Sequence, residues 1–221
     1  MGKVDCYFQR GRYTVDMNDL LQALFRWIHL VAGITWIGML YFFNLINAHV
    51  TAALQPATRR EVIPQLMPRA LWWFRWGAMF TFLSGLLLIL WKYFLFGSGF
   101  TGDAGLFGSS AGLWISMGAL FGTIMWYNVW FIIWPAQQRL ITWVKEGETP
   151  PEQPQVAKTA LYASRTNTFL SVPMLFGMLA GAGHYPSISF FPWFIMVIAL
   201  GVGLVYYLIF KFSSTVAKTW P

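Results

Sequence analysis

Three histidines are the residues whose type and spacing could support chemistry in this chain. His29 lies in an apolar stretch near the N-terminus, His49 follows 20 residues later, and His184 closes a later apolar stretch. At 1.5 Å per helical residue, His29 and His49 are about 30 Å apart and cannot share one metal or haem. A six-coordinate haem b takes one neutral imidazole from each of two helices. We therefore predict that His29 and His184 are haem iron ligands and that His49 is an interfacial residue.

Two residues near His29 would complete such a site. Gly33 lies one helical turn beyond His29 and would leave room for the edge of a porphyrin. Arg26 lies on the His29 side, where its charge could pair with a haem propionate. We predict Gly33 and Arg26 as further cofactor-binding residues. The alternative is that both histidines are interfacial and bond lipid, water or a carbonyl without any metal.

Other groups that could carry chemistry are few. Cys6 is the single cysteine, which excludes an internal disulfide, covalent haem c and a cysteine-ligated cluster within this chain. The apolar stretches contain no Asp or Glu, so a proton-pumping carboxylate relay has no candidate residues. Arg75, which is flanked by tryptophans, could meet an anionic ligand or reach the headgroups. Asn44, Asn47 and Asn128 are expected to form hydrogen bonds between helices.

The composition shows which elements must position these residues. The 221 residues are 57% hydrophobic and 10% charged, whereas soluble domains carry roughly a quarter charged residues. A spanning helix needs about 20 mostly apolar residues. Five stretches qualify, at residues 24–48, 71–96, 113–134, 157–183 and 190–212. We predict an all-α integral membrane protein with a bundle of about five transmembrane helices. Residues 1–23 would form an extramembrane segment, and 24–221 a single transmembrane domain.

The predicted connections and packing follow from local signals. We expect residues 50–69 to form a loop, Pro135 to stop the third helix, and residues 140–144 to lie flat in the headgroup region. Two pairs of glycines four residues apart favour close helix packing. These are Gly118 with Gly122, and Gly177 with Gly181.

The net charge of +7 has two possible meanings. The basic residues are scattered through the loops, which does not favour nucleic-acid binding. Five Lys and Arg residues lie on the membrane side of the N-terminus, and ten lie on the opposite side. This excess predicts an outside N-terminus and a cytoplasmic C-terminus.

The first twenty residues contain three Asp and no apolar run, so no cleavable signal peptide is expected. With five alternating helices, His29 and His184 would lie at similar depth. The expected location is a bacterial inner membrane.

Two segments carry a resemblance to a known family. They are RWIHLVAGITWIGMLYFFN at residues 26–44, and ASRTNTFLSVPMLFGM at residues 163–178 followed by HYP. They resemble the membrane domain of the PuuD-type urate oxidase family, in which a multi-helix membrane domain is joined to a C-terminal cytochrome c. The resemblance points to His29, Trp36, Arg165, Asn167, Pro173 and His184. It implies redox work at a membrane, with electrons leaving toward a c-type cytochrome.

The chain also departs from the family pattern. It is expected to lack the cytochrome c part, and Thr166 stands where a family histidine would be expected. Residues of the second segment also have a structural interpretation. Pro173 would free the carbonyl of Phe169 and bend the helix, while Arg165 and Asn167 at its cytoplasmic end would bond freed carbonyls.

Three functions remain open from the sequence. The leading hypothesis is a membrane-embedded electron-transfer subunit that binds haem b and works with a c-type cytochrome or a larger complex. The second is a urate-oxidising membrane oxidoreductase, and the third is a cofactor-free structural subunit. The expected partners are membrane lipid and other subunits of a hetero- or homo-oligomer, without nucleic acid.

Overall fold

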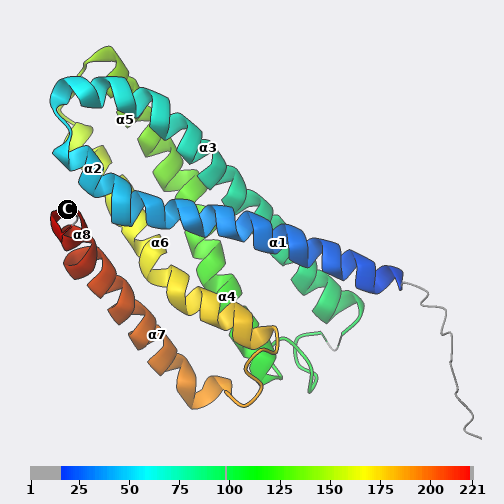
Figure 1. Ribbon diagram of the computed structural model, residues 1–221. Coiled ribbons are helices and arrows are strands. Elements are labelled where there is room, and N and C mark those ends of the chain that lie inside the picture. Colours follow the sequence, from blue (N-terminus) through cyan, green and yellow to red (C-terminus); the bar gives the residue numbers. More distant parts are fainter. Residues whose placement is uncertain (1–15, 98, 220–221) are drawn as a thin grey trace, which may run out of the picture.

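The computed structural model describes residues 16–97 and 99–219, and within these ranges the chain consists of helices and short connections without strands. Five long helical rods follow one another along the chain (Figure 1). The prediction of an all-α protein with about five long helices is confirmed.

The first rod contains α1 (Met17–Tyr41), a π-helical segment η1 (Phe42–Asn47) and α2 (Ala48–Ala53). It begins upstream of the predicted start because the side chain of Asp16 accepts a hydrogen bond from the Asn18 amide at 2.9 Å and caps the helix. His29 therefore lies twelve residues inside α1 rather than near its start.

The second rod begins after a turn at Leu54 and Gln55, with α3 (Pro56–Ile89) and the π-helical η2 (Leu90–Leu95). The predicted loop over residues 50–69 was wrong, because most of this segment is helical. Pro56 occupies the first turn of α3, where its missing N–H costs nothing. Pro64 lies further inside, but Arg60, one turn before it, is exposed, so the carbonyl that Pro64 leaves unpaired lies at an accessible end of the helix.

The third rod contains α4 (Ser110–Tyr127), the π-helical η3 (Asn128–Ile133) and α5 (Trp134–Glu146). The prediction that Pro135 stops this helix was wrong. Pro135 falls at the start of α5, directly after η3. The wider π turn relieves the clash between the proline ring and the preceding turn. The helix ends instead at Gly147, whose φ of 75° is the left-handed conformation that glycine adopts readily.

The last two rods are α6 (Gln153–Gly181), and α7 (Phe190–Tyr207) with η4 (Leu208–Phe212) and α8 (Ser213–Thr219). Four rods are long and apolar enough to cross a membrane, namely Met17–Ala53, Pro56–Leu95, Ser110–Glu146 and Phe190–Val216. The chain is therefore a multi-pass membrane protein. The remaining rod, α6, has 29 residues but does not reach that hydropathy, because it carries polar residues that it buries inside the bundle.

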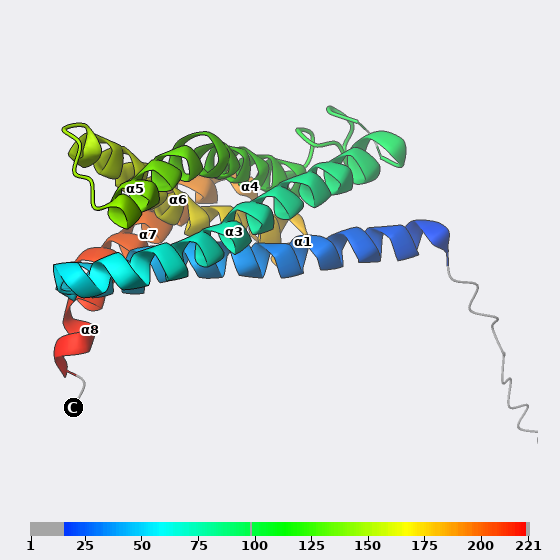
Figure 2. The same cartoon turned by 90° about the horizontal axis from the view of Figure 1, so that it is seen from above.

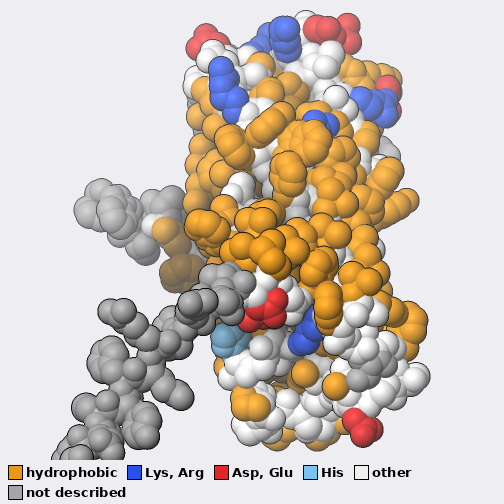
Figure 3. Space-filling model, turned by 90° about the vertical axis from the view of Figure 1, so that its right-hand side faces the viewer, with side chains coloured by type: hydrophobic (Ala, Val, Ile, Leu, Met, Phe, Trp, Pro, Cys, Tyr) orange, Lys and Arg blue, Asp and Glu red, His pale blue; other side chains and the backbone are white. Residues whose placement is uncertain are grey.

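The rods pack as antiparallel neighbours. α1 lies along α3, α4 lies along α6, and α7 packs against the outer side of α6 (Figures 1 and 2). The larger apolar core joins α1, α3, η3 and α6 through side chains such as Trp36, Leu40, Phe74 and Met125. The surface shows a broad apolar band between two polar ends, as expected where lipid surrounds a bundle (Figure 3).

Candidate functional site

The middle of α6 carries a stripe of polar side chains. Ser164, Asn167, Thr168 and Ser171 stand at positions i, i+3, i+4 and i+7, so they share one helical face. Asn167, Thr168 and Ser171 are at most 1% exposed. Polar groups inside a membrane protein need protein partners, because lipid supplies none. The partners of the stripe therefore come from the helices that it faces.

Asn167 bonds the third rod at the point where α4 becomes π-helical. Its Oδ1 accepts a hydrogen bond from Nδ2 of Asn128 at 2.8 Å, and its Nδ2 donates to the carbonyl of Met125 at 2.9 Å. Asn128 is the first residue of η3. At the change from α- to π-helical hydrogen bonding, the Met125 carbonyl accepts the backbone N–H of Asn128 and has a second lone pair for a side-chain donor. Asn167 supplies that donor to Met125.

Asn44 likewise donates to a backbone carbonyl beside a π-helical segment, in the first rod. It lies in the π-helical η1, and its Nδ2 donates both to the carbonyl of Leu40 at 3.0 Å and to Oγ of Ser164 at 2.9 Å. Two π-helical segments thus each present an asparagine to the polar stripe of α6. Such segments occur frequently at functional sites, since they hold a side chain in a place that a regular helix does not offer.

A third contact closes this network. The hydroxyl of Tyr41 lies 2.9 Å from Oγ of Ser171, which also bonds the carbonyl of Thr168 at 2.7 Å. We call the whole set the central polar seam; it consists of Tyr41, Asn44, Asn128, Ser164, Asn167, Thr168 and Ser171. The seam joins three rods without a charged group. It can fix their rotation and register, and it contains no His, Lys or carboxylate that could activate its hydroxyl groups.

The sequence indicated only part of the seam. The expectation that Asn44 and Asn128 bond between helices is confirmed by their contacts with α6. Tyr41, Ser164, Thr168 and Ser171 were not singled out for a role. The spacing of polar residues along residues 164–171 was the signal that could have identified them, because it marks a polar face on a buried helix.

His29 lies at the interface of α1 with α3. Its Nδ1 lies 2.9 Å from the carbonyl of Thr81 and 3.3 Å from Oγ of Ser84, and its ring packs against Gly85. A carbonyl partner at Nδ1 fixes the tautomer that carries its proton there, so Nε2 keeps a free lone pair. Histidines that bind metals commonly use this arrangement. Within the described residues, no group of three His, Cys, Asp or Glu side chains is placed to hold a metal ion.

His184 lies outside the helices, in the connection between α6 and α7. Its side chain is exposed and its amide donates to the carbonyl of Leu179 at 3.2 Å. Tyr41 meets Ser171 in the antiparallel pair α1 and α6, and His29 lies twelve residues before Tyr41 while His184 lies thirteen after Ser171. His29 is therefore about 18 Å from that pair along α1, and Gly181, where α6 ends before His184, is about 15 Å from it along α6. The two helices diverge toward this end, however (Figure 1). The contacts of His29 are with α3 and do not include His184.

The glycines near these histidines differ in their surroundings. A Cβ on Gly177 would meet the carbonyl of Trp114 at 2.9 Å, and one on Gly181 would overlap with Ile115, so these two faces are filled by α4. A Cβ on Gly33 would make an ordinary contact with Thr81 at 3.8 Å, and one on Gly183 would meet nothing within 4 Å. One imidazole, His29, fits an axial ligand, but the described arrangement does not provide the second side of a haem site.

Arg26 is exposed, and its Nη2 donates to Oε1 of Gln22 at 3.1 Å. It lies one turn before His29 on α1, and the described residues hold it by no other hydrogen bond. His49 lies exposed on α2, at the opposite end of the first rod from Arg26.

The remaining residues from the resemblance serve packing. Trp36 is 2% exposed in the core, with no partner for its Nε1 among the described residues. Pro173 is buried against Gly201 of α7, and the Arg165 guanidinium lies 5.1 Å from the Phe210 ring centre. The expectation that Asn167 bonds a backbone carbonyl is confirmed by its contact with Met125. Its expected place at the end of the helix was wrong, because α6 begins fourteen residues earlier.

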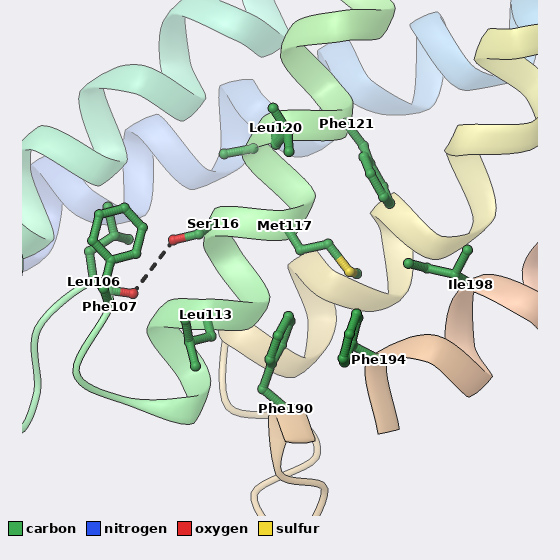
Figure 4. A pocket seen from close by; sticks show the side chains of 11 residues that line it. Leu106, Phe107, Leu113, Ser116, Met117, Leu120, Phe121, Phe190, Phe194 and Ile198 are labelled. Carbon is green, nitrogen blue, oxygen red and sulfur yellow. Dashed lines mark hydrogen bonds between the residues drawn. The ribbon is translucent and has the colours of Figure 1, made fainter. Parts of the chain in front are cut away.

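An apolar groove of about 600 Å³ lies between α4 and α7 (Figure 4). Its walls include Met117, Phe121, Phe190 and Phe194. The hydroxyl of Ser116, the polar side chain in its lining, bonds the carbonyl of Gly112 at 2.9 Å. The groove has no group that could act on a substrate, and its chemistry suits a hydrocarbon chain.

The fold and the seam together define a class of protein: a multi-pass α-helical membrane bundle held by an uncharged hydrogen-bond network. The family described as Urate oxidase N-terminal matches residues 104–221, just over half of the chain. This chain belongs to that family. Neither the curated proteins nor the solved structures yield a significant match. The matched range contains Asn128, Asn167 and His184, whereas His29 lies outside it.

Proposed function

We propose that this chain is the membrane-embedded part of a redox protein related to urate oxidation, and that it works with a c-type cytochrome or with other membrane subunits. The observation that carries the proposal is the family match, which covers α4, α5, α6 and α7. The polar groups of the α6 string that carried the resemblance lie largely in the seam. In this view, Asn128 and Asn167 hold α4 and α6 in the register that the rest of the protein requires.

An assay in membranes tests this proposal. Vesicles that contain the chain, with and without added ferricytochrome c, are supplied with urate. Urate absorbance should fall and ferricytochrome c should become reduced, because the electrons removed from urate need an acceptor. Vesicles without the chain provide the control. If a correctly inserted chain, together with the subunits that co-purify with it, gives no urate-dependent reduction, urate oxidation is wrong for this protein.

A haem b site on His29 and His184, with Arg26 and Gly33 nearby, is the finer form of this proposal. The carbonyl of Thr81 at Nδ1 of His29 supports it, because that contact leaves Nε2 free. A bound haem would supply one-electron chemistry. The chain's own part would be to hold His29 in one tautomer. Since His184 is exposed and the faces of Gly177 and Gly181 are filled by α4, the haem site requires α1 and α6 to approach each other.

A visible spectrum of the purified protein tests the haem site. The reduced-minus-oxidised difference should show a b-type α-band. His29→Ala and His184→Ala should both abolish the band, and His49→Ala should leave it intact. A flat spectrum at full protein recovery contradicts haem binding. A flat spectrum with co-purified subunits favours instead the cofactor-free structural subunit.

We also propose a bacterial inner membrane location with the N-terminus outside and the C-terminus in the cytoplasm. The excess of Lys and Arg on one side supports this orientation. A C-terminal green fluorescent protein fusion should fluoresce, because green fluorescent protein folds when it lies in the cytoplasm. A C-terminal alkaline phosphatase fusion should stay inactive, and the opposite pair of results contradicts the orientation.

A further inference from the structure

The guanidinium of Arg75 is surrounded by indole rings. Its Cζ lies 4.0 Å from the ring centre of Trp134, 4.9 Å from that of Trp130 and 5.6 Å from that of Trp76. Trp76 and Trp130 meet edge to face at 5.6 Å. These residues come from α3, η3 and α5, so only the tertiary fold assembles them. We call them the Arg75–tryptophan cluster.

The cluster contains hydrogen-bond donors without acceptors. Nε of Arg75 and Nε1 of Trp130 are both shielded, and neither has a hydrogen-bond partner in residues 16–97 and 99–219. Nor does any carboxylate in those ranges pair with Arg75, since the ion pair found there joins Arg139 to Glu152. An unpaired charge within a membrane-spanning helix is costly and marks a functional position. The described carboxylates therefore leave the charge of Arg75 to be met by a group outside these residues.

The position of the cluster along the rods indicates where that group would come from. Arg69 lies six residues before Arg75 on α3, and Arg139 lies five residues after Trp134 on α5. Both are therefore within about 9 Å of the cluster along the helix axes. Trp72 and Trp73 beside it are 47% and 57% exposed. Exposed tryptophans next to basic residues are typical of the boundary between headgroups and acyl chains.

We propose that the Arg75–tryptophan cluster binds the phosphate of an anionic phospholipid. The guanidinium presents N–H donors in a fork that matches phosphate oxygens. The three rings hold the guanidinium by cation–π contact, so little side-chain freedom is lost on binding. The basic residues at this end attract anionic headgroups to the same layer. A lipid bound there would brace α3 against α5.

Native mass spectrometry of the delipidated protein tests this site. Phosphatidylglycerol and phosphatidylcholine with the same acyl chains are added in equal amounts, and inorganic phosphate is added in a separate arm. The wild-type chain should retain phosphatidylglycerol in preference. Arg75→Gln should weaken its retention about tenfold, as expected for the loss of a charge-assisted hydrogen bond. Lys92→Gln, at the opposite end of the same rod, is the control and should retain it within about twofold of wild type.

Two further variants protect the test against misfolding. Trp130→Phe keeps an aromatic ring beside the guanidinium but removes the indole N–H. It should weaken phosphatidylglycerol retention less than Arg75→Gln does. Arg75→Lys keeps the charge without the fork and should lie between Arg75→Gln and wild type. Equal retention of both lipids by the wild type, or undiminished preference in Arg75→Gln, would overturn the proposal. Displacement of the lipid by inorganic phosphate at millimolar concentration would overturn the lipid assignment.

Discussion

Asn128 and Asn167 form a side-chain pair at 2.8 Å that is buried between the third rod and α6. Asn128 begins a π-helical segment, and Asn167 simultaneously donates to the Met125 carbonyl beside that segment. An irregular stretch of one helix is thereby matched to a polar face of another. Both residues lie in the range that matches the family.

Asn167→Ala should destabilise the protein by about 1–3 kcal/mol, because it leaves the buried side-chain amide of Asn128 without its acceptor and removes the side-chain donor to the Met125 carbonyl. Thermal unfolding in detergent, followed by circular dichroism, measures the loss. Thr166→Ala is the matched control, since Thr166 is exposed on the adjacent position of α6. Equal stability of the two variants would mean that the pair contributes nothing.

Tyr41 and Ser171 should be energetically coupled through their 2.9 Å contact. Tyr41→Phe and Ser171→Ala each remove it, so the double variant should lose less stability than the two single variants together. The coupling is expected to be about 0.6 kcal/mol, the average for hydrogen bonds between membrane helices. A double-mutant cycle of unfolding free energies measures it. Strictly additive losses would argue against a hydrogen bond in the membrane-embedded protein.

Gly177→Ala should push α4 and α6 apart, since its Cβ would lie 2.9 Å from the backbone carbonyl oxygen of Trp114. A backbone atom cannot move aside as a flexible side chain can, so a loss of about 1–3 kcal/mol is expected. Gly122→Ala on α4 is the control, because no atom lies within 4 Å of the added Cβ. Midpoints of thermal unfolding compare the two, and a harmless Gly177→Ala would contradict this close approach.

Gly201→Ala should loosen α7 from α6. Its Cβ would lie 2.8 Å from Cδ of Pro173, a rigid ring inside α6. Gly203→Ala, two residues further along the same helix, adds its Cβ to open space. Crosslinking of cysteines introduced across α6 and α7 should slow in the first variant and not in the second. Unchanged crosslinking in Gly201→Ala would contradict the contact.

His184 should be far more accessible from water than His29. In a Cys6→Ser background, a cysteine at position 184 should react rapidly with a membrane-impermeant maleimide, because this side chain is exposed in a connection. A cysteine at position 29 should react slowly, because its side chain packs against α3 at Thr81, Ser84 and Gly85. Labelling of the two positions from opposite sides of the membrane would remove the basis for the haem site.

The sequence by itself determined that lipid is the solvent of this protein. Hydropathy is a local property, so apolar runs such as residues 71–96 identify membrane-embedded helices without knowledge of their neighbours. The count of chain reversals likewise predicted one level for His29 and His184. Local signals were less reliable at Pro56 and Pro135, where a helix start and a π turn accommodate the ring.

Only the tertiary structure decided which faces meet. Whether Asn167 finds Asn128, or Arg75 finds Trp130 and Trp134, depends on the rotation of each helix about its axis and on the crossing angles between helices. These quantities arise from the packing of whole helices and leave no mark in a single stretch of sequence. The same reason separates His29 from His184: equal depth follows from counting residues, whereas the lateral distance follows from the divergence of α1 and α6.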